Sequence, residues 1–516
     1  MGLRAGRRGV DRGRSRSVPS GSPVSSMVGP AGPDRGPAGW QRRLRGVDPW
    51  LVGTVLLSVV IGSLVLLANI PGAEPGNDAG FYHAEGLFLA GHGPDPVPGY
   101  GIGTGLFVRG PVYPALLGLI YAVTGGGHLR AVAAVQTLVL LPGTAIVAYG
   151  LGRRLGGRRA ARAAALAFVL WLPATFHASF VLTETLAGVL VTGATLAVVV
   201  ALQDPRPSRL VVAGALVGLA SFTHTSYQFF WIPAGGALAI ALVSRSWRTR
   251  DPGWWRTAAA RCGLVAAGVL VVLAPYQGIR AGGGYPAPGT GGYDLGAGAG
   301  WTMYAGSRPE TSWRVIPDDY VLAELAFTPS GFEELRTRVA SGEVSLSPEL
   351  RDAIRRRARE PRKEDRHLTE ADFRSAVMAS YVRNLDDTPR MAATKWWRYT
   401  DPVPTYALAT EVEELDRVSR PVYHLAALAL LPMLALAILL ARPGQRLPLI
   451  VGSAGALFQV AALLLSYPEP RYLFPFLGTL LAGAATGGVL LFDRITGRGD
   501  RPGGSRDPAS CCRSAG

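Results

Sequence analysis

A group of polar residues follows the first long apolar segment, in the stretch PGNDAGFYHAEGLFLAGHG, which contains Asp78, Tyr82, His83 and Glu85. If this stretch is helical, Asp78 and Tyr82 are four residues apart and share one face. A carboxylate that is partly shielded from water has a pKa suited to accepting a proton from a hydroxyl group, so Asp78 is the candidate general base. The alternatives are a solvated loop acid or a cap for the helix that follows.

Two more ionisable residues stand at the ends of apolar helices. Glu184, in SFVLTETLAGVL, falls in the first turn of its helix. Acids in a membrane are costly and usually have a partner or a role, although simple capping of the helix N-terminus is the alternative. His224, in SFTHTSYQFF, is the weaker candidate, because a lone histidine at a helix end is more often a hydrogen-bonded structural residue than a ligand.

Arg471, in SYPEPRYLFPF, stands at the start of the last apolar helix. The helix dipole does not favour a cation there, so a phosphate or carboxylate partner would explain its position. An ion pair with Glu469, or an extended side chain that reaches the lipid headgroups, is the alternative. Further candidates for a lipid phosphate, with a surface charge as the alternative, are Arg109, Arg280, Lys395 and Arg398.

Other chemistries leave no pattern in the sequence. There is no phosphate-binding P-loop, no HExxH zinc motif, no nucleophile elbow, and no Cys/His spacing typical of a metal site. The closely spaced glycines of GIGTGLFVRG do not follow a strand in an alternating strand and helix unit, so they carry no dinucleotide signal. The three cysteines support no disulfide framework.

The elements that must position these residues are membrane helices. The chain has 516 residues, of which 48% are hydrophobic and 17% charged, and its apolar residues recur in long blocks. About 20 apolar residues span a bilayer core. The net charge of +16 does not indicate nucleic acid, because the basic residues stand in short loops between apolar blocks, as cytoplasmic loops do. We therefore expect an all-α polytopic membrane protein.

The apolar pattern predicts about 10 transmembrane helices. A shorter apolar stretch at 111–123 predicts an interfacial helix in the first outer loop. Because the basic short loops all fall on one side, both termini are expected in the cytoplasm and the candidate site on the extracytoplasmic face of the cell membrane. The spans are expected at about 50–70, 129–152, 160–178, 183–202, 208–222, 227–244, 262–279, 421–441, 447–466 and 472–492.

This pattern divides the chain into five parts. Residues 1–46 form a basic cytoplasmic tail expected to be disordered, and 495–516 form a second such tail. Residues 47–280 form an N-terminal transmembrane module with the first outer loop at 71–128. Residues 281–420 form a partly helical extracytoplasmic region, and 421–494 hold the C-terminal transmembrane helices.

Several segments, taken in order from about 50 to 492, resemble the polytopic GT-C glycosyltransferases of the protein O-mannosyltransferase and aminoarabinose transferase kind. They include NDAGFYHAEG, GPVYPALLGLIYAVTGG, ASFVLTETL, GALVGLASFTHT, ASYVRNLDDTPRMAATKWWRY and PEPRYLFPF. The resemblance implies a sugar donor carried on a polyprenyl phosphate and an acid of the first outer loop as the general base. Carried over by position, Asp78 is that catalytic acid, and Arg471 with Tyr472 is the pair that contacts the donor phosphate.

We expect the substrate-binding residues to be Tyr82, His83, Glu85, Glu184, His224, Arg471 and Tyr472. The chain departs from many relatives at two places. Asn77 and Ala79 flank Asp78, so the first loop lacks a paired acid, and the sequence leaves metal and cofactor unassigned. His224 stands where relatives often carry Arg or Lys.

The expected function is transfer of a hexosyl or pentosyl group from a polyprenyl-phosphate-linked donor to a protein, lipid or polysaccharide of the cell envelope, with no nucleic acid partner. The first alternative is a transporter or flippase for a lipid-linked glycan, which would need charged residues along a path near the bilayer midplane. The second is a membrane scaffold without enzymatic activity.

Overall fold

The computed structural model describes residues 48–68, 78–93, 110–282 apart from 225–226, 228 and 249–251, much of 303–400, 413–465 and 470–497. The predicted tail 1–46, nearly all of the predicted tail 495–516, the Gly-rich segment 283–302, Arg109 and Glu469 lie outside the described residues.

The described part of the chain is helical and contains no strand. Six helices in it are long and apolar enough to cross a membrane, which confirms the predicted all-α polytopic membrane class. Their apolar segments are Pro49–Leu67, Leu129–Val169, Glu184–Gln203, Trp254–Pro275, Arg420–Leu440 and Arg471–Ile495.

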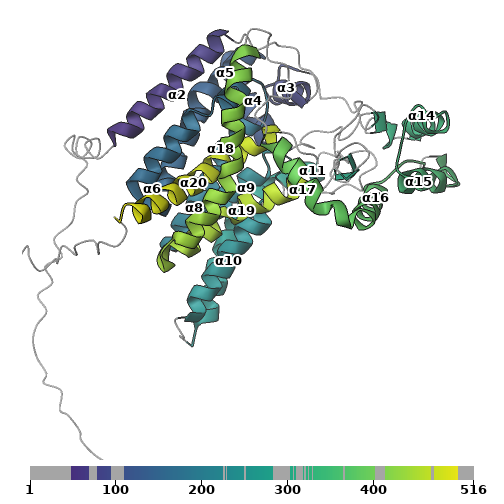
Figure 1. The fold of residues 1–516 in the computed structure, drawn as a ribbon. Helices are drawn as coiled ribbons and strands as arrows, with labels where there is room; N and C mark the ends of the chain where they lie inside the picture. The colour runs from purple at the N-terminus through teal and green to yellow at the C-terminus, as the bar shows by residue number, and fades with distance from the viewer. Residues whose placement is uncertain are drawn as a thin grey trace, which may run out of the picture. The chain divides into compact units, whose positions relative to one another are not determined.

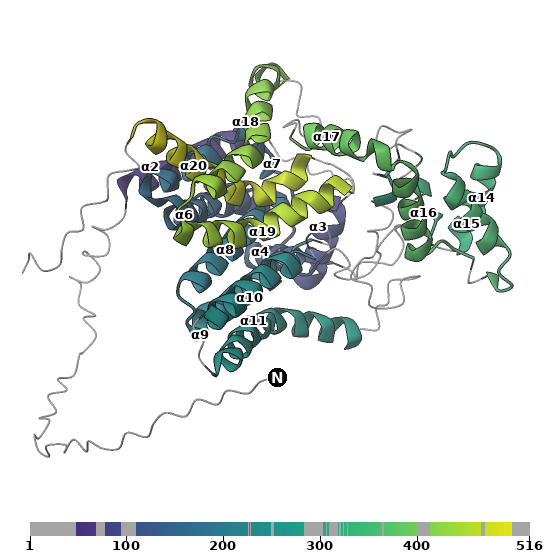
Figure 2. The same ribbon diagram turned by 60° about the horizontal axis from the view of Figure 1, so that its bottom comes forward.

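Four of the helices that contribute to the largest buried core pack closely on one another. Figures 1 and 2 show α6 (Leu141–Val169), α8 (Glu184–Gln203) and α20 (Phe474–Ile495) running alongside one another, and α18 (Glu413–Leu440) packs on α20. Small residues let these helices approach closely, as in membrane bundles generally. A Cβ on Gly487 of α20 would come within 2.2 Å of the Met433 carbonyl oxygen on α18.

The chain reverses direction inside α6. Gly157 has a positive φ of 81° and a ψ of −167°, and Gly152 lies against Ala160 and Ala161 on the returning half. The reversal agrees with the two helices predicted at 129–152 and 160–178. The second prediction was wrong at its end, because the helix stops at Val169 and a separate short helix, α7 (Leu172–His177), follows. Pro173 explains this break, since it has no N–H to donate to the Val169 carbonyl and is tolerated only in the first turn of a helix, which is its place in α7.

The remaining membrane helices surround this bundle. α9 (Pro207–Ser221) packs on α11 (Trp254–Gly282), and α10 (Trp231–Arg248) packs on α11 and on α19 (Pro443–Leu465). The outer-loop segment forms α3 (Asp78–Leu89), which packs on the short helix α4 (Val112–Thr124) at the place where the sequence predicts an interfacial helix.

The described part of 281–420 has a hydrophobic core of its own. That core joins α14 (Pro329–Ala340), α15 (Pro348–Ala358) and α16 (Glu370–Arg383). A serine cap begins α15, since Ser347 Oγ accepts a hydrogen bond from the Leu350 amide. The next helix, α17 (Thr388–Tyr399), instead packs on α19 and on the 3₁₀ turn η7 (Pro470–Leu473), next to the membrane bundle.

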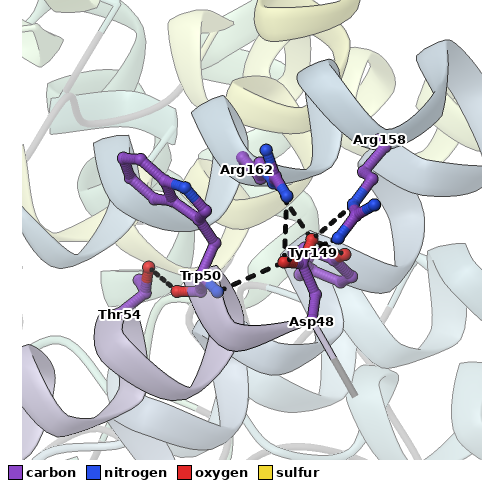
Figure 3. Close-up of polar contacts among 6 residues, drawn as sticks. All are labelled: Asp48, Trp50, Thr54, Tyr149, Arg158 and Arg162. Atoms are coloured by element: carbon purple, nitrogen blue, oxygen red, sulfur yellow. Dashed lines mark hydrogen bonds and ion pairs between the residues drawn. The ribbon is translucent and has the colours of Figure 1, made fainter. Parts of the chain in front are cut away.

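A buried carboxylate ties the start of α2 (Pro49–Ala68) to α6, as Figure 3 shows. Asp48 accepts hydrogen bonds from Arg158 Nε and Arg162 Nε, both at 3.0 Å, and from the Tyr149 hydroxyl at 2.7 Å. The Arg158 and Arg162 guanidiniums hold the pKa of Asp48 well below its usual range. The sequence analysis gave Asp48 no role, because its partners lie about 100 residues away.

Two more arginines near the chain reversal at Gly157 contact the C-terminal ends of α8 and α20. Arg154 donates to Gln203, the last residue of α8, at 3.3 Å, and Arg159 pairs with Asp493, near the end of α20, at 2.9 Å. The starts of α8 and α20 therefore lie at the opposite end of the bundle from the arginine-rich turn.

Candidate active site

Glu184 and His177 meet across a tight turn. α7 ends at His177 and α8 begins at Glu184, and the six residues between them bring the two side chains together. His177 Nε2 lies 3.4 Å from Glu184 Oε2. Both residues are almost fully buried, with exposed fractions of 3% and 2%. A buried carboxylate is stable only when paired, so the simple cap is not a sufficient account of Glu184.

Arg471 supplies the second partner of Glu184. It lies in η7, directly before α20, and its Nε is 3.6 Å from Glu184 Oε1. Its Nη2 is 3.4 Å from the Tyr472 hydroxyl, and the guanidinium lies 5.1 Å from the centre of that ring. Arg471 is only 7% exposed. The sequence predicted a phosphate or a carboxylate partner for Arg471, and in the structure the carboxylate of Glu184 lies beside it.

Aromatic rings surround this ion pair. His224 lies between two of them, with its ring centre 5.6 Å from Tyr227 and 6.1 Å from Tyr472. Tyr227 stands edge-on to Phe476 of α20 at 5.6 Å. His177 contacts Phe474 at the start of α20, with ring centres 5.0 Å apart. The predicted residues His224, Arg471 and Tyr472 thus come together with Glu184.

Helix α3 contributes Tyr82 and Glu85. Tyr82 is 1% exposed and packs edge-on against Tyr113 of α4 at 5.1 Å. Burial, and then the charges of Glu184 and Glu85, raise the pKa of Tyr82 well above its usual range. Glu85 is itself buried. The charge of Glu184 therefore acts on Tyr82 of α3.

Two other predicted site residues of α3, His83 and Asp78, differ from Tyr82 and Glu85. His83 turns to α4, where its Nδ1 lies 2.9 Å from the Tyr121 hydroxyl. Asp78 is the first residue of α3, so the predicted helix exists. The side chain of Asp78 lies outside what the structure describes.

A buried glutamine holds the turn between His177 and Glu184. Gln136 Nε2 donates to the carbonyl oxygens of Ala178, at 2.9 Å, and Phe180, while Gln136 Oε1 accepts from the Tyr113 hydroxyl at 2.7 Å. Gln136 is also the first residue of a π-helical segment, Gln136–Leu140. Such segments occur often at functional sites.

Sequence reasoning missed His177, Gln136, Tyr227 and Tyr399 as parts of this region. His177 precedes Glu184 by seven residues, and two ionisable residues that flank one short predicted turn were an available signal. The other three residues sit in apolar or aromatic surroundings and offer no comparable pattern.

The arrangement suits an anionic ligand that bears several oxygen atoms. A buried guanidinium supplies charge-assisted hydrogen bonds, and the surrounding tyrosines supply hydroxyl donors. Among the described residues no group of three or more His, Cys, Asp or Glu side chains could hold a metal ion.

Residues 108–275 match the family model described as "Dolichyl-phosphate-mannose-protein mannosyltransferase". No curated protein matches the chain in a sequence search. The match covers α4 to α11 and includes Glu184, His224 and Tyr227.

Two solved structures are similar in fold. The archaeal oligosaccharyltransferase AglB from Archaeoglobus fulgidus, in complex with an inhibitory peptide and a dolichol-phosphate, has 13% identity and a TM-score of 0.47, with 87% of this chain and 51% of that chain covered. ArnT from Cupriavidus metallidurans, bound to undecaprenyl phosphate, has 17% identity and a TM-score of 0.37, with 87% and 79% covered.

The chain spans about half the length of the archaeal protein, and both TM-scores lie below 0.5. The family match confirms the resemblance predicted from the sequence: over residues 108–275 this chain is similar to the dolichyl-phosphate-mannose-protein mannosyltransferases.

Proposed function

We propose that this chain is a membrane glycosyltransferase that moves a sugar from a polyprenyl-phosphate-linked donor to an acceptor on the extracytoplasmic face. The observation that carries the proposal is the buried Arg471, which is held by Glu184 where two membrane helices begin. A lipid phosphate that enters sideways from the bilayer would meet a guanidinium at the depth of its own headgroup.

The reaction assigns a role to each part of this site. The acceptor hydroxyl oxygen forms a bond to the anomeric carbon of the sugar while the bond from that carbon to the phosphate oxygen breaks. Asp78, which starts the helix whose next turn carries Tyr82, takes the acceptor proton. Arg471 stabilises the negative charge that develops on the departing polyprenyl phosphate, and Tyr472 assists it. Glu184 and His177 hold Arg471 in place.

We also propose how the chain is oriented in the membrane and how it is divided into domains. We place the arginine-rich end of the bundle, with Asp48 and Arg158, in the cytoplasm because basic residues accumulate on that side. The Glu184 end then faces outward, and residues 281–420 lie on the same side, where they would help to select the acceptor. Transfer from hexose-linked or from pentose-linked donors in the assay would identify the transferred group.

The distribution of buried charge disfavours the transporter alternative. Within the six candidate spans, the buried charged side chains in the described part of the chain are Glu184 and Arg471. Each is the first residue of its span. A path across the bilayer would place ionisable groups near the middle of the helices.

The test is a transfer assay with the purified full-length chain in lipid nanodiscs. A panel of polyprenyl-phosphate sugars is offered with a cell-envelope extract as acceptor, and release of polyprenyl phosphate is followed together with labelled product. We expect transfer from one donor class, loss of transfer in Asp78→Asn, and retention in Asp48→Asn, which removes a carboxylate at the opposite end. Transfer that survives Asp78→Asn would remove Asp78 as the base, and no transfer from any donor would contradict the glycosyltransferase assignment.

A further inference from the structure

Three tyrosine hydroxyls near the Glu184 ion pair are buried without a hydrogen-bond partner among the described residues. They belong to Tyr82, Tyr227 and Tyr399, whose exposed fractions are 1%, 0% and 0%. Most buried polar groups in folded proteins are hydrogen-bonded, because an unsatisfied hydroxyl loses its contacts with water and gains none in return. Three such hydroxyls in one region therefore need an explanation.

The three tyrosines come from distant elements, and two of them, Tyr227 and Tyr399, pack in the same core as η7. Tyr82 lies on α3, Tyr227 lies in the connection between α9 and α10, and Tyr399 ends α17. Tyr227 and Tyr399 share one buried core with Leu473 and Phe474, and α17 packs directly on η7. The chain thus brings Tyr227 and Tyr399, from two separate elements, into the core around the segment that carries Arg471.

Electrostatic contacts support this convergence. After burial, which is the largest cause, Tyr472 raises the pKa of Tyr82, Tyr227 and Tyr399 alike. Arg471 acts in the opposite direction on Tyr82 and Tyr227. Because the pKa of each tyrosine is raised well above its usual range, each hydroxyl keeps its proton and remains a donor at neutral pH.

We propose that the hydroxyls of Tyr227 and Tyr399, together with that of Tyr82, donate hydrogen bonds to the phosphate oxygens of the ligand that Arg471 attracts. An ionised phosphate accepts hydrogen bonds and donates none, so buried protonated hydroxyls beside a guanidinium match its requirements. The inference rests on the proposed function for its choice of a lipid-borne phosphate.

The position of Tyr399 gives this binding site a link to the extracytoplasmic region. Tyr399 is the last residue of α17, which belongs to the segment 281–420 and not to a membrane helix. The region 281–420 therefore contributes a hydroxyl group to the proposed phosphate site.

The test uses tyrosine to phenylalanine variants, which remove only the oxygen atom. Tyr227→Phe and Tyr399→Phe are compared with the wild-type chain and with Tyr113→Phe, a matched control whose buried hydroxyl does have a partner, Gln136, at 2.7 Å. Affinities are measured for polyprenyl monophosphate without sugar, for polyprenyl alcohol and for inorganic phosphate. The thermal midpoint of each ligand-free protein is measured in parallel.

We expect Tyr227→Phe and Tyr399→Phe each to weaken binding of polyprenyl monophosphate about tenfold, since a lost hydrogen bond to a charged group has that order of effect. Their ligand-free midpoints should equal or exceed the wild-type value, because each change removes an unsatisfied polar atom. Tyr113→Phe should lower the midpoint. Polyprenyl alcohol should bind wild type and the two variants equally.

Several outcomes would overturn the inference. One is wild-type affinity for polyprenyl monophosphate in both variants, and another is a lowered ligand-free midpoint with unchanged affinity. A third is an effect seen only with a sugar-loaded donor, because that result would assign the hydroxyls to the sugar. Inorganic phosphate binding as tightly as the lipid would show that the site takes free phosphate. A chain that binds polyprenyl monophosphate through these tyrosines but transfers no sugar would refute the proposed function alone, whereas normal transfer and normal binding in both variants would refute this inference alone.

Discussion

Removal of the charge on Glu184 should destabilise the protein as well as inactivate it. Glu184→Gln keeps the size and shape of the side chain but leaves Arg471 buried beside a neutral amide. The Nε to Oε1 distance is 3.6 Å, and at an effective dielectric constant of about 20 this separation corresponds to an attraction of about 5 kcal/mol. Loss of one partner from a buried pair typically costs about 3 to 5 kcal/mol, because the remaining charge has no compensation.

The result should be visible in thermal unfolding. A loss of about 3 kcal/mol in a chain of 516 residues corresponds to a fall of roughly 3 °C in the midpoint. The measurement uses intrinsic fluorescence of the ligand-free protein in nanodiscs, with Glu184→Gln, Arg471→Met and the double variant in one series. Since the double variant removes both charges, its midpoint should lie above the value that the two single effects predict by addition, with a coupling free energy of about 2 to 3 kcal/mol.

The reasoning has a clear point of failure. If Glu184→Gln unfolds at the wild-type temperature, or if the two substitutions are additive, Arg471 does not depend on Glu184 for its charge balance. The site would then lack the buried ion pair on which the proposed phosphate contact is built.

Three further predictions concern stability elsewhere in the chain. Arg158 and Arg162 lower the pKa of Asp48, so this carboxylate stabilises the fold at pH values above its ordinary pKa of about 4. Asp48→Asn should lower the midpoint at pH 7, and the difference from wild type should shrink below about pH 4 in midpoints recorded across pH. Burial lowers the pKa of Lys395 from 10.5 to about 7. The free energy of unfolding should therefore rise from pH 7 toward pH 10, by at most about 1.4 kcal/mol per pH unit. Lys395→Met should remove this pH dependence in the same titration. Gly487→Leu should lower the midpoint strongly because a Cβ there meets a carbonyl oxygen of α18 at 2.2 Å, whereas Gly488→Ala, which meets only a methyl carbon at 3.6 Å, should change it little.

The sequence was a good guide to the helices of the membrane bundle. Long apolar runs predicted the positions of α2, α8 and α20 to within three residues, because few structures other than a helix can bury such a run in lipid. The same rule failed at 160–178, where Pro173 ends one helix and starts another within an apolar stretch. Apolar composition alone does not distinguish a continuous helix from two short ones.

The site was partly within reach of the sequence. An acid in the first turn of an apolar helix and an arginine at the start of another are expensive in lipid, so Glu184 and Arg471 could be identified singly. Their mutual contact could not be foreseen, since 287 positions separate them. Lys395 could equally have been a surface charge, but it is fully buried.

Composition and apolar periodicity by themselves determined that this chain lies in a membrane, which of its segments are helical and which polar residues are costly enough to need a partner. Those properties follow from each residue's own preference for lipid or water. The tertiary structure decided the pairing of Glu184 with Arg471 and His177, the support of their turn by Gln136, and the packing of Tyr227 and Tyr399 in one core with η7. Such contacts depend on how helices pack and where the chain reverses, and packing brings together residues whose separation along the chain carries no record of their distance in space.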